Sequence, residues 1–481
     1  MITDNSSKEE LMATQQYHGI PYHVWNQSTD MESFMKYFGV GPEMIVRGEG
    51  AIVYNQRGTR YINGISSLWS VAAGMGRQEL VEAASKQMGE LAFSGCWSQV
   101  HPSAIELAAR LVEITSGHYQ QVMFGSNGSD AVEAALKMAR QFHRQSPNLA
   151  DRGRYKIISL RGSYHGFSYG CLSTSGEARD TDLFGPLLPG FVQIEPPYCY
   201  RCPYGKDGFP GCELACAQAL EEKIQAESAE TAAALIIEPV MGDFGVVAGP
   251  DEYYTRLGEI CQRYGLLLIA DEVTTGFGRT GKLFASQDWN PQPDILCLGK
   301  AISNGYFPVS ATLATQAVYE RFLGKGQWFP HGVTHGGHPV GCVVGLASID
   351  IIFKENLTEN SARVGAYLKS RLEELMTHHR VIGDVRGKGL MLAIELVQDR
   401  ESKMPIAPKA SYNLSNEIAL LGLLFSTLKN NLCLLPPLIL DESLADEIVR
   451  IFDRAFSRNP LVKLGNKSQM LKEFILSKIR P

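Results

Sequence analysis

The sequence predicts an α/β protein built on a mainly parallel sheet, because short apolar segments alternate with helix-like segments between about residues 100 and 345. Five apolar segments are too short for helices and rich in Ile, Leu or Val, as buried parallel strands are: 121–125, 155–160, 233–241, 266–273 and 295–301. Segments 129–143 and 250–265 carry small or apolar residues at helical spacing, so we expect helices there.

The pattern changes after about residue 346. A long helix is expected from 346 onward, then a pair of strands within 385–397, then further helix. We therefore expect a large domain over 70–345 and a smaller α+β domain. The smaller domain would combine an N-terminal segment, 1–69, with the C-terminal part, 346–481.

Composition excludes several classes of protein. With 45 basic and 51 acidic side chains and 44% hydrophobic residues, the chain lacks the excess positive charge that binds nucleic acid. No apolar stretch is long enough to span a membrane, and the N-terminus does not resemble a signal peptide. Ten cysteines, six of them scattered singly, suggest a reducing compartment. We expect a cytoplasmic protein.

Two charged residues directly follow apolar strands. Ligands in open α/β sheets bind beyond the carboxyl ends of strands, so Asp271 and Lys300 are candidate site residues. A single lysine after a strand is ordinarily a solvated surface group. The pairing of this lysine with a carboxylate at a similar position favours a functional site.

Pyridoxal phosphate is a cofactor that needs such a pair. It requires a lysine amine for a Schiff base, a carboxylate beside its ring nitrogen and a backbone site for its phosphate. The segment 125–130, Gly-Ser-Asn-Gly-Ser-Asp, lies between an expected strand and helix and offers glycines and free helix N–H groups to an anion. Alternatively, Asn127 or Ser129 merely caps the helix.

A set of motifs resembles the class III aminotransferases in order and spacing across about residues 20–455. They are Phe124–Ala131, Tyr164-His165-Gly166, Glu238-Pro239-Val240, Asp271-Glu272-Val273, Gly299-Lys300-Ala301 and His331–Pro339. The resemblance implies a fold type I PLP-dependent transferase with pyridoxal 5'-phosphate as cofactor, acting as a homodimer with shared active sites.

The resemblance also implies residue roles. Lys300 is similar to the Schiff-base lysine and Asp271 to the partner of the ring nitrogen. Val273 and Tyr164 would contact opposite faces of the ring. Asn127, Gly128 and Ser129 match the phosphate turn, and Thr334 matches a threonine that reaches the phosphate from the neighbouring subunit. His165 is a candidate hydrogen-bonding neighbour, and Glu238 a cofactor-binding or structural carboxylate.

The implied reaction moves an amino group from an ω-amine or amino acid to a keto acid or aldehyde through pyridoxamine phosphate, with Lys300 moving a proton. The same residues could serve an epimerase, decarboxylase or aminomutase, because the fate of the carbanion depends on the pocket. A catalytically idle binding protein is the third reading, and the intact Lys300 and Asp271 oppose it.

A few residues of the sequence also indicate a substrate preference. Trp25, Trp69 and Trp97 are candidate pocket walls, or core residues, in a chain that resembles the ω-amine and taurine–pyruvate branch. Ser426 stands where many members carry an arginine that clamps a carboxylate. Lys429 lacks the planar fork of a guanidinium, and Arg386 and Arg279 are the other candidates for that role.

Four cysteines are clustered in the sequence: Cys199, Cys202, Cys212 and Cys216. They could form a structural zinc site, but the wide second spacing and similar segments in the ω-amine branch favour free thiols. We expect no metal. The segment 461–481 extends past the region of resemblance, and only a possible helix is expected there.

Overall fold

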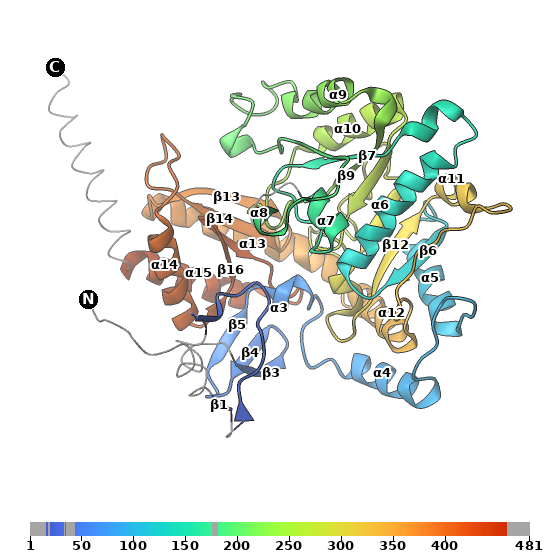
Figure 1. Cartoon of the computed structure of the whole chain (residues 1–481). Helices are drawn as coiled ribbons and strands as arrows, with labels where there is room; N and C mark the ends of the chain where they lie inside the picture. The colour runs from blue at the N-terminus through green and yellow to red at the C-terminus, as the bar shows by residue number, and fades with distance from the viewer. Residues whose placement is uncertain (1–15, 18–19, 33, 35–43, 176–180, 459–481) are drawn as a thin grey trace, which may run out of the picture.

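A computed structural model describes residues 16–17, 20–32, 34, 44–175 and 181–458 (Figure 1). Its centre is a seven-stranded sheet in the order β6-β12-β11-β10-β9-β7-β8. The pairs β8–β7, β7–β9, β9–β10 and β10–β11 are parallel. The strand bounds are β6 Gln121–Gly125, β7 Lys156–Leu160, β8 Phe191–Ile194, β9 Ala232–Ile237, β10 Leu267–Asp271, β11 Ile295–Leu298 and β12 Ser310–Ala314.

The prediction of a mainly parallel sheet is confirmed, but the prediction for its first strand is wrong in part. Segment 121–125 is a strand, but the expectation of a buried parallel strand is wrong, because β6 lies at the sheet edge and pairs antiparallel with β12. β12 also runs antiparallel to β11. Its sequence, Ser-Ala-Thr-Leu-Ala, has little of the branched character that predicts a strand, and the sequence analysis missed it together with β8.

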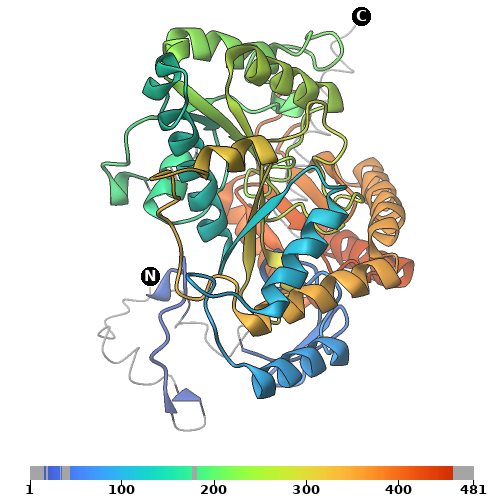
Figure 2. The same ribbon diagram turned by 90° about the vertical axis from the view of Figure 1, so that its right-hand side faces the viewer.

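Helices cover both faces of this sheet. Neighbouring strand residues point to opposite faces, so Ile236 and Ile269 join a core cluster with α6, while Leu235 and Leu268 join the cluster that contains residues of α10 and α12. Burial on both faces explains the continuous apolar segments. The helices are α4 Gln78–Glu90, α5 Pro102–Ile114, α6 Gly128–Arg144, α7 Tyr169–Thr174, α9 Ala215–Ala226, α10 Asp251–Tyr264 and α12 Pro339–Lys354. Figure 2 shows α4 beside α12.

The C-terminal part carries a four-stranded antiparallel sheet, β13-β14-β17-β16, packed with α13 and α15. Its elements are β13 Ile382–Lys388, β14 Met391–Leu396, β16 Ser426–Leu428, β17 Asn431–Leu434, α13 Leu357–His378, α14 Pro408–Leu420 and α15 Glu442–Arg458. The single long helix expected from residue 346 is wrong. The helix ends at Lys354, and α13 begins at Leu357 after Asn356 adopts left-handed φ 50°.

A second four-stranded sheet joins distant parts of the chain, as Figure 1 shows for the blue strands beside the red-orange elements. β15 (Leu423–Leu424) pairs parallel with β5 (Arg60–Asn63), which continues to β4 (Ile52–Asn55) and β3 (Ile45–Glu49). An Arg60–Glu447 ion pair of 2.7 Å adds to this junction.

The remaining elements are short. They are β1 Gln16–Tyr17, β2 Ile20–Pro21, α3 Ser66–Trp69, α8 Thr181–Phe184, α11 Gln316–Tyr319, and the 3-10 turns Leu149–Gly153, Cys199–Arg201, Ala229–Thr231, Lys300–Ser303 and Glu320–Phe322. Among the described helices, none is both long and apolar enough to cross a membrane. The segment 461–481 lies outside the described residues.

Candidate functional site

Three neighbouring strands place three charged side chains at one edge of the large sheet. Asp271 is the last residue of β10 and pairs in register with Cys297 of β11, three residues before Lys300. Glu238 follows β9, whose Ile237 pairs with Ala270. Because the carboxyl ends of parallel strands lie together, the topology brings Asp271, Glu238 and the turn that carries Lys300 to the same edge of the sheet.

Asp271 is buried and held by two hydrogen bonds. His165 Nδ1 lies 2.7 Å from Asp271 Oδ2, and the Val273 N–H donates to Asp271 Oδ1 at 3.1 Å. Within the described structure, His165 Nε2 is buried without a hydrogen-bond partner. The His165 ring therefore holds one oxygen of the Asp271 carboxylate, and the turn that follows β10 orients the other oxygen.

Glu272 serves a different purpose. The buried carboxylate accepts from the N–H and hydroxyl of Ser286, each at 2.6 Å, from the Ala285 N–H at 2.8 Å and from the Thr275 hydroxyl at 2.9 Å. These bonds satisfy the carboxylate and fix the loop after β10. Of the two adjacent acids, Asp271 is therefore the one left to the site.

Lys300 emerges from the turn after β11 with a left-handed backbone, φ 45°. Its ammonium donates to Thr274 Oγ1 at 2.5 Å and lies 4.9 Å from the centre of the Trp69 ring. Burial lowers the pKa of Lys300, while the carboxylates of Asp243, Asp271 and Glu238 oppose this shift. The surface-lysine reading of Lys300 is wrong.

Glu238 ties two loops to the site. It accepts from the Tyr164 N–H at 2.9 Å and from the Gly242 N–H at 3.4 Å. Burial, reinforced by the nearby Asp271 carboxylate, raises the pKa of Glu238 well above its usual range. Burial also raises the pKa of the Tyr164 hydroxyl to about 12.

The 125–130 turn leads into α6, and Asn127 is the N-cap, accepting from the Asp130 N–H at 3.1 Å. The prediction that Asn127 caps the helix is therefore confirmed. A Cβ on Gly128 would lie 2.8 Å from the Val273 side chain, so only glycine fits there. A Cβ on Gly166 would lie 2.2 Å from Ser129 Oγ, which places the Tyr-His-Gly segment against the same turn.

Asp243 is the site residue that the sequence analysis missed. It lies in the turn after β9, and its negative charge contributes to raising the pKa values of Lys300, Tyr164 and Glu238. The only sequence signal is an acid a few residues past the Glu238-Pro239-Val240 motif, which looks like any acid in a polar turn.

The three tryptophans have different surroundings. Trp69 is 8% exposed and packs beside Lys300 and Gly242. Trp25 and Trp97 are 86% and 70% exposed, so the core reading of these two is wrong. Trp97 lies against Gly332. The loop that contains Gly332 also carries Thr334, which is exposed and whose carbonyl lies beside Gly95.

Neither Arg386 nor Arg279, the two arginines considered for the role expected at Ser426, has a free guanidinium. Ser426 begins β16, opposite Cys433. Arg386 donates to Asp384 at 2.9 Å, Glu395 at 2.7 Å and Asn431 at 2.6 Å. Arg279 is fully buried and donates to the carbonyls of Pro436 and Leu390. Both guanidinium groups are occupied by structural contacts.

The clustered cysteines are free thiols in this structure: Cys199, Cys202, Cys212 and Cys216. Among the described residues, no group of three or more His, Cys, Asp or Glu side chains has the geometry to hold a metal ion. Burial raises the pKa of Cys216 to about 12.

Comparison with known proteins supports one family. The chain is 36% identical over 433 residues to an adenosylmethionine-8-amino-7-oxononanoate aminotransferase of Geobacter sulfurreducens, covering 89% of this chain and 94% of that protein. It is 36% identical over 448 residues to a taurine–pyruvate aminotransferase of Bilophila wadsworthia, covering 90% and 95%.

Solved structures agree. An amine transaminase from an uncultivated Pseudomonas species, in its PLP-bound form, superposes with TM-score 0.86 at 38% identity and covers 91% of this chain and 98% of that one. An (S)-enantioselective ω-transaminase from Thermomicrobium roseum gives TM-score 0.85 at 38% identity, covering 90% and 96%. Residues 39–456 match the family described as Aminotransferase class-III, and the chain therefore belongs to the class III aminotransferases.

Proposed function

We propose that Lys300 binds pyridoxal phosphate and that the surrounding residues perform transamination on it. The observation that carries this proposal is the partly buried Lys300 amine, which Thr274 holds at the sheet edge where β9 and β10 present Glu238 and Asp271. The residues fit the cofactor: the free N–H groups at the start of α6 suit its phosphate, and Gly128 leaves the backbone open beside Val273.

Each residue has a proposed role. The Asp271 carboxylate, oriented by His165, keeps the ring nitrogen of the cofactor protonated. Asn127, Gly128 and Ser129 bind the phosphate, and Val273 and Tyr164 contact the ring faces. Glu238 positions the Tyr164 segment through its backbone N–H.

When bound, pyridoxal phosphate supplies an electrophilic carbon and a conjugated ring that accepts electrons from a breaking C–H bond. Lys300 moves the proton between the substrate carbon and the cofactor. Its pKa is lowered by burial, so the neutral amine needed of a base is more accessible than on an exposed lysine. The Thr274 hydroxyl holds that amine in place, and Trp69 shields it from water.

The substrates we propose are an ω-amine donor and a keto acid or aldehyde acceptor, by analogy with the taurine–pyruvate and ω-transaminase relatives. The purified holoenzyme, mixed with an amine panel without acceptor, should convert its cofactor to the amino form and release one carbonyl product per site. Decarboxylation or epimerisation without stoichiometric carbonyl release would contradict the proposal.

The assembly and location are part of the same proposal. We infer a homodimer with shared sites, because the exposed Thr334 and Trp97 lie in one surface region available to a partner subunit. The division into a large domain, 70–345, and a small domain formed by 1–69 and 346–481 is supported by the β5–β15 pairing. A cytoplasmic location is consistent with the free thiols of the described cysteines.

A further inference from the structure

Residues 66–69, called here the Trp69 turn, adopt a left-handed backbone. The φ angles are 46° at Ser66, 47° at Ser67, 68° at Leu68 and 65° at Trp69. In residues that carry a side chain, this conformation brings Cβ too close to the following carbonyl oxygen, so four such residues in succession are strained. Such strain persists only where the surrounding structure holds it, and it is concentrated at functional sites.

The turn carries the ring that covers the Lys300 amine. Lys300 Nζ lies 4.9 Å from the centre of the Trp69 ring, and a Cβ on Gly242 would lie 2.8 Å from the same ring. Within the described structure, Trp69 Nε1 is buried without a hydrogen-bond partner. The place of the indole over the amine therefore depends on packing and on the backbone of the turn.

Asn63 holds the start of the turn. It is the last residue of β5 and is 1% exposed. Its Oδ1 accepts from the Ser67 N–H at 3.0 Å, and its Nδ2 donates to the Ser67 hydroxyl at 3.1 Å. Because Ser67 is the second of the four left-handed residues, these two bonds stabilise the strained conformation.

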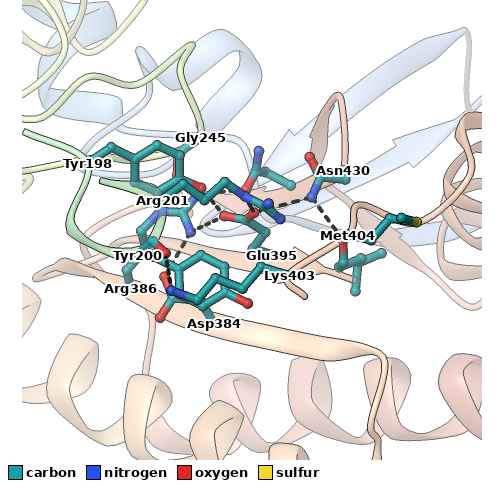
Figure 3. A network of polar contacts seen from close by, with 12 residues as sticks. Tyr198, Tyr200, Arg201, Gly245, Asp384, Arg386, Glu395, Lys403, Met404 and Asn430 are labelled. Carbon is teal, nitrogen blue, oxygen red and sulfur yellow. Dashed lines mark hydrogen bonds and ion pairs between the residues drawn. The ribbon is translucent and has the colours of Figure 1, made fainter. Parts of the chain in front are cut away.

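Arg279 holds the same turn through Ser66. Arg279 Nη2 lies 3.3 Å from the Ser66 hydroxyl, which in turn donates to the Leu435 carbonyl at 2.5 Å. Figure 3 shows a contrasting case in Arg386, whose guanidinium is paired with two carboxylates. Among the described residues, Arg279 has no such partner, and burial lowers its pKa to about 9. A buried cation without a carboxylate is costly, so we attribute its presence to the hydrogen bonds that it donates.

The chain after the turn is tied to the segment that carries Lys300. Asn304, four residues after Lys300, is fully buried. Its Oδ1 accepts from the Ala73 N–H at 2.5 Å, and its Nδ2 donates to the Gly74 carbonyl at 2.9 Å. The chain on both sides of the Trp69 turn is therefore anchored, and the ring and the amine are held at a defined distance.

We propose that Asn63 and Arg279 are positioning residues for transamination, because they hold the strained Trp69 turn and so keep the indole over the Lys300 amine. This inference rests on the proposed function and adds what limits the size of the amine donor. A ring held beside the amine restricts the space for a substrate, whereas a relaxed turn lets the ring move aside. The face of the ring also attracts the ammonium that forms when Lys300 takes a proton.

Fluorine NMR of the holoenzyme labelled with 5-fluorotryptophan tests the position of the ring. The chain has five tryptophans, and Trp69→Phe identifies the Trp69 signal. Asn63→Ala should shift or broaden this signal, because it removes both bonds to Ser67. Asn63→Asp should restore the signal in part, because a carboxylate still accepts from the Ser67 N–H.

Asn55→Ala is the matched control. Asn55 is also 1% exposed and ends the neighbouring strand β4, where it accepts from the N–H groups of Arg57 and Thr59, each at 3.0 Å. Its loss removes the same kind of bond from the turn between β4 and β5. The Trp69 signal should stay in place in this variant.

Donor size gives the functional readout, measured as kcat/KM for 1-phenylethylamine relative to ethylamine from the loss of the cofactor's visible absorbance. Asn63→Ala should raise this ratio by about tenfold, because two hydrogen bonds that oppose movement of the ring are gone. Asn55→Ala should leave the ratio unchanged. If Asn63→Ala folds poorly, Ser66→Ala removes only the hydroxyl that links Arg279 to the turn. It should change the signal and the ratio in the same direction and to a smaller extent.

Three results would overturn the proposal while leaving the proposed function intact. The first is an unchanged Trp69 signal in both Asn63→Ala and Ser66→Ala. The second is an equal shift of this signal in Asn55→Ala, which would reduce the effect to lost stability. The third is a shifted signal with an unchanged ratio of the two amines. Failure of every amine to convert the wild-type cofactor would instead overturn the proposed function, and with it the role of these residues in transamination.

Discussion

His165 Nδ1 lies 2.7 Å from Asp271 Oδ2, and both side chains are buried. A buried carboxylate is costly without partners, so the imidazole contributes both charge stabilisation and orientation. Since Asp271 is at a strand end and His165 in a loop, the pair joins two segments that are 106 residues apart.

The first prediction concerns this pair. His165→Asn should lower kcat by about ten- to a hundredfold, because a hydrogen bond to a charged group contributes roughly 1.5–3 kcal/mol. The cofactor spectrum should shift as the ring nitrogen loses its oriented partner. A matched control is His379→Asn, which breaks a similar His379–Asp453 contact of 2.6 Å away from the site. A spectrum that shifts equally in both variants would argue against a positioning role for His165.

Asp271→Asn should retain cofactor binding but reduce the rate by roughly two to four powers of ten, since removing one partner of a buried charged pair costs about 3–5 kcal/mol. Rates per bound cofactor and absorbance spectra would measure this. Glu272→Gln is the control, because within the described residues the Glu272 carboxylate accepts hydrogen bonds from the loop that follows β10. It should lower the Tm while leaving the spectrum in place. Normal turnover by Asp271→Asn would remove Asp271 from its proposed role.

Lys300→Ala should abolish turnover and the visible absorbance of lysine-bound cofactor while preserving the circular dichroism of the fold. The amine is the only group of this side chain that can bond covalently to the cofactor. Lys282→Ala, which removes an exposed lysine paired with Asp288 at 2.8 Å, should retain both properties. Retained activity in the Lys300 variant is the result that this assignment could not survive.

Shared active sites can be tested at limiting pyridoxal phosphate by mixing an inactive chain with a chain that binds the cofactor weakly. If Thr334 serves the neighbouring subunit, Thr334→Ala should weaken cofactor binding by about tenfold. A hybrid of Lys300→Ala and Thr334→Ala chains would then contain one site with both native residues. Activity should therefore rise on mixing, and sedimentation should show a dimer. A fully active monomer, or mixing without recovery, would mean that Thr334 acts within its own chain or not at all.

The strand-end rule predicted Asp271 and Lys300 because each comes at the end of an uninterrupted apolar segment, and the structure places them at the ends of adjacent strands, Asp271 as the last residue of β10 and Lys300 in the turn after β11. Asp243 could not be predicted in this way, since its position depends on Trp69 and Arg386, which are distant in sequence. The edge position of β6 was missed for a related reason. β12, which separates β6 from β11, is made of small residues with weak strand propensity, and only its pairing partners define it as a strand.

The last prediction concerns Ser426. With Arg386 and Arg279 engaged elsewhere, Ser426→Arg should supply a bidentate partner and lower the KM for pyruvate, while donors without a carboxylate are unaffected or slowed. A higher KM for pyruvate in this variant would show that position 426 does not face the acceptor's carboxylate.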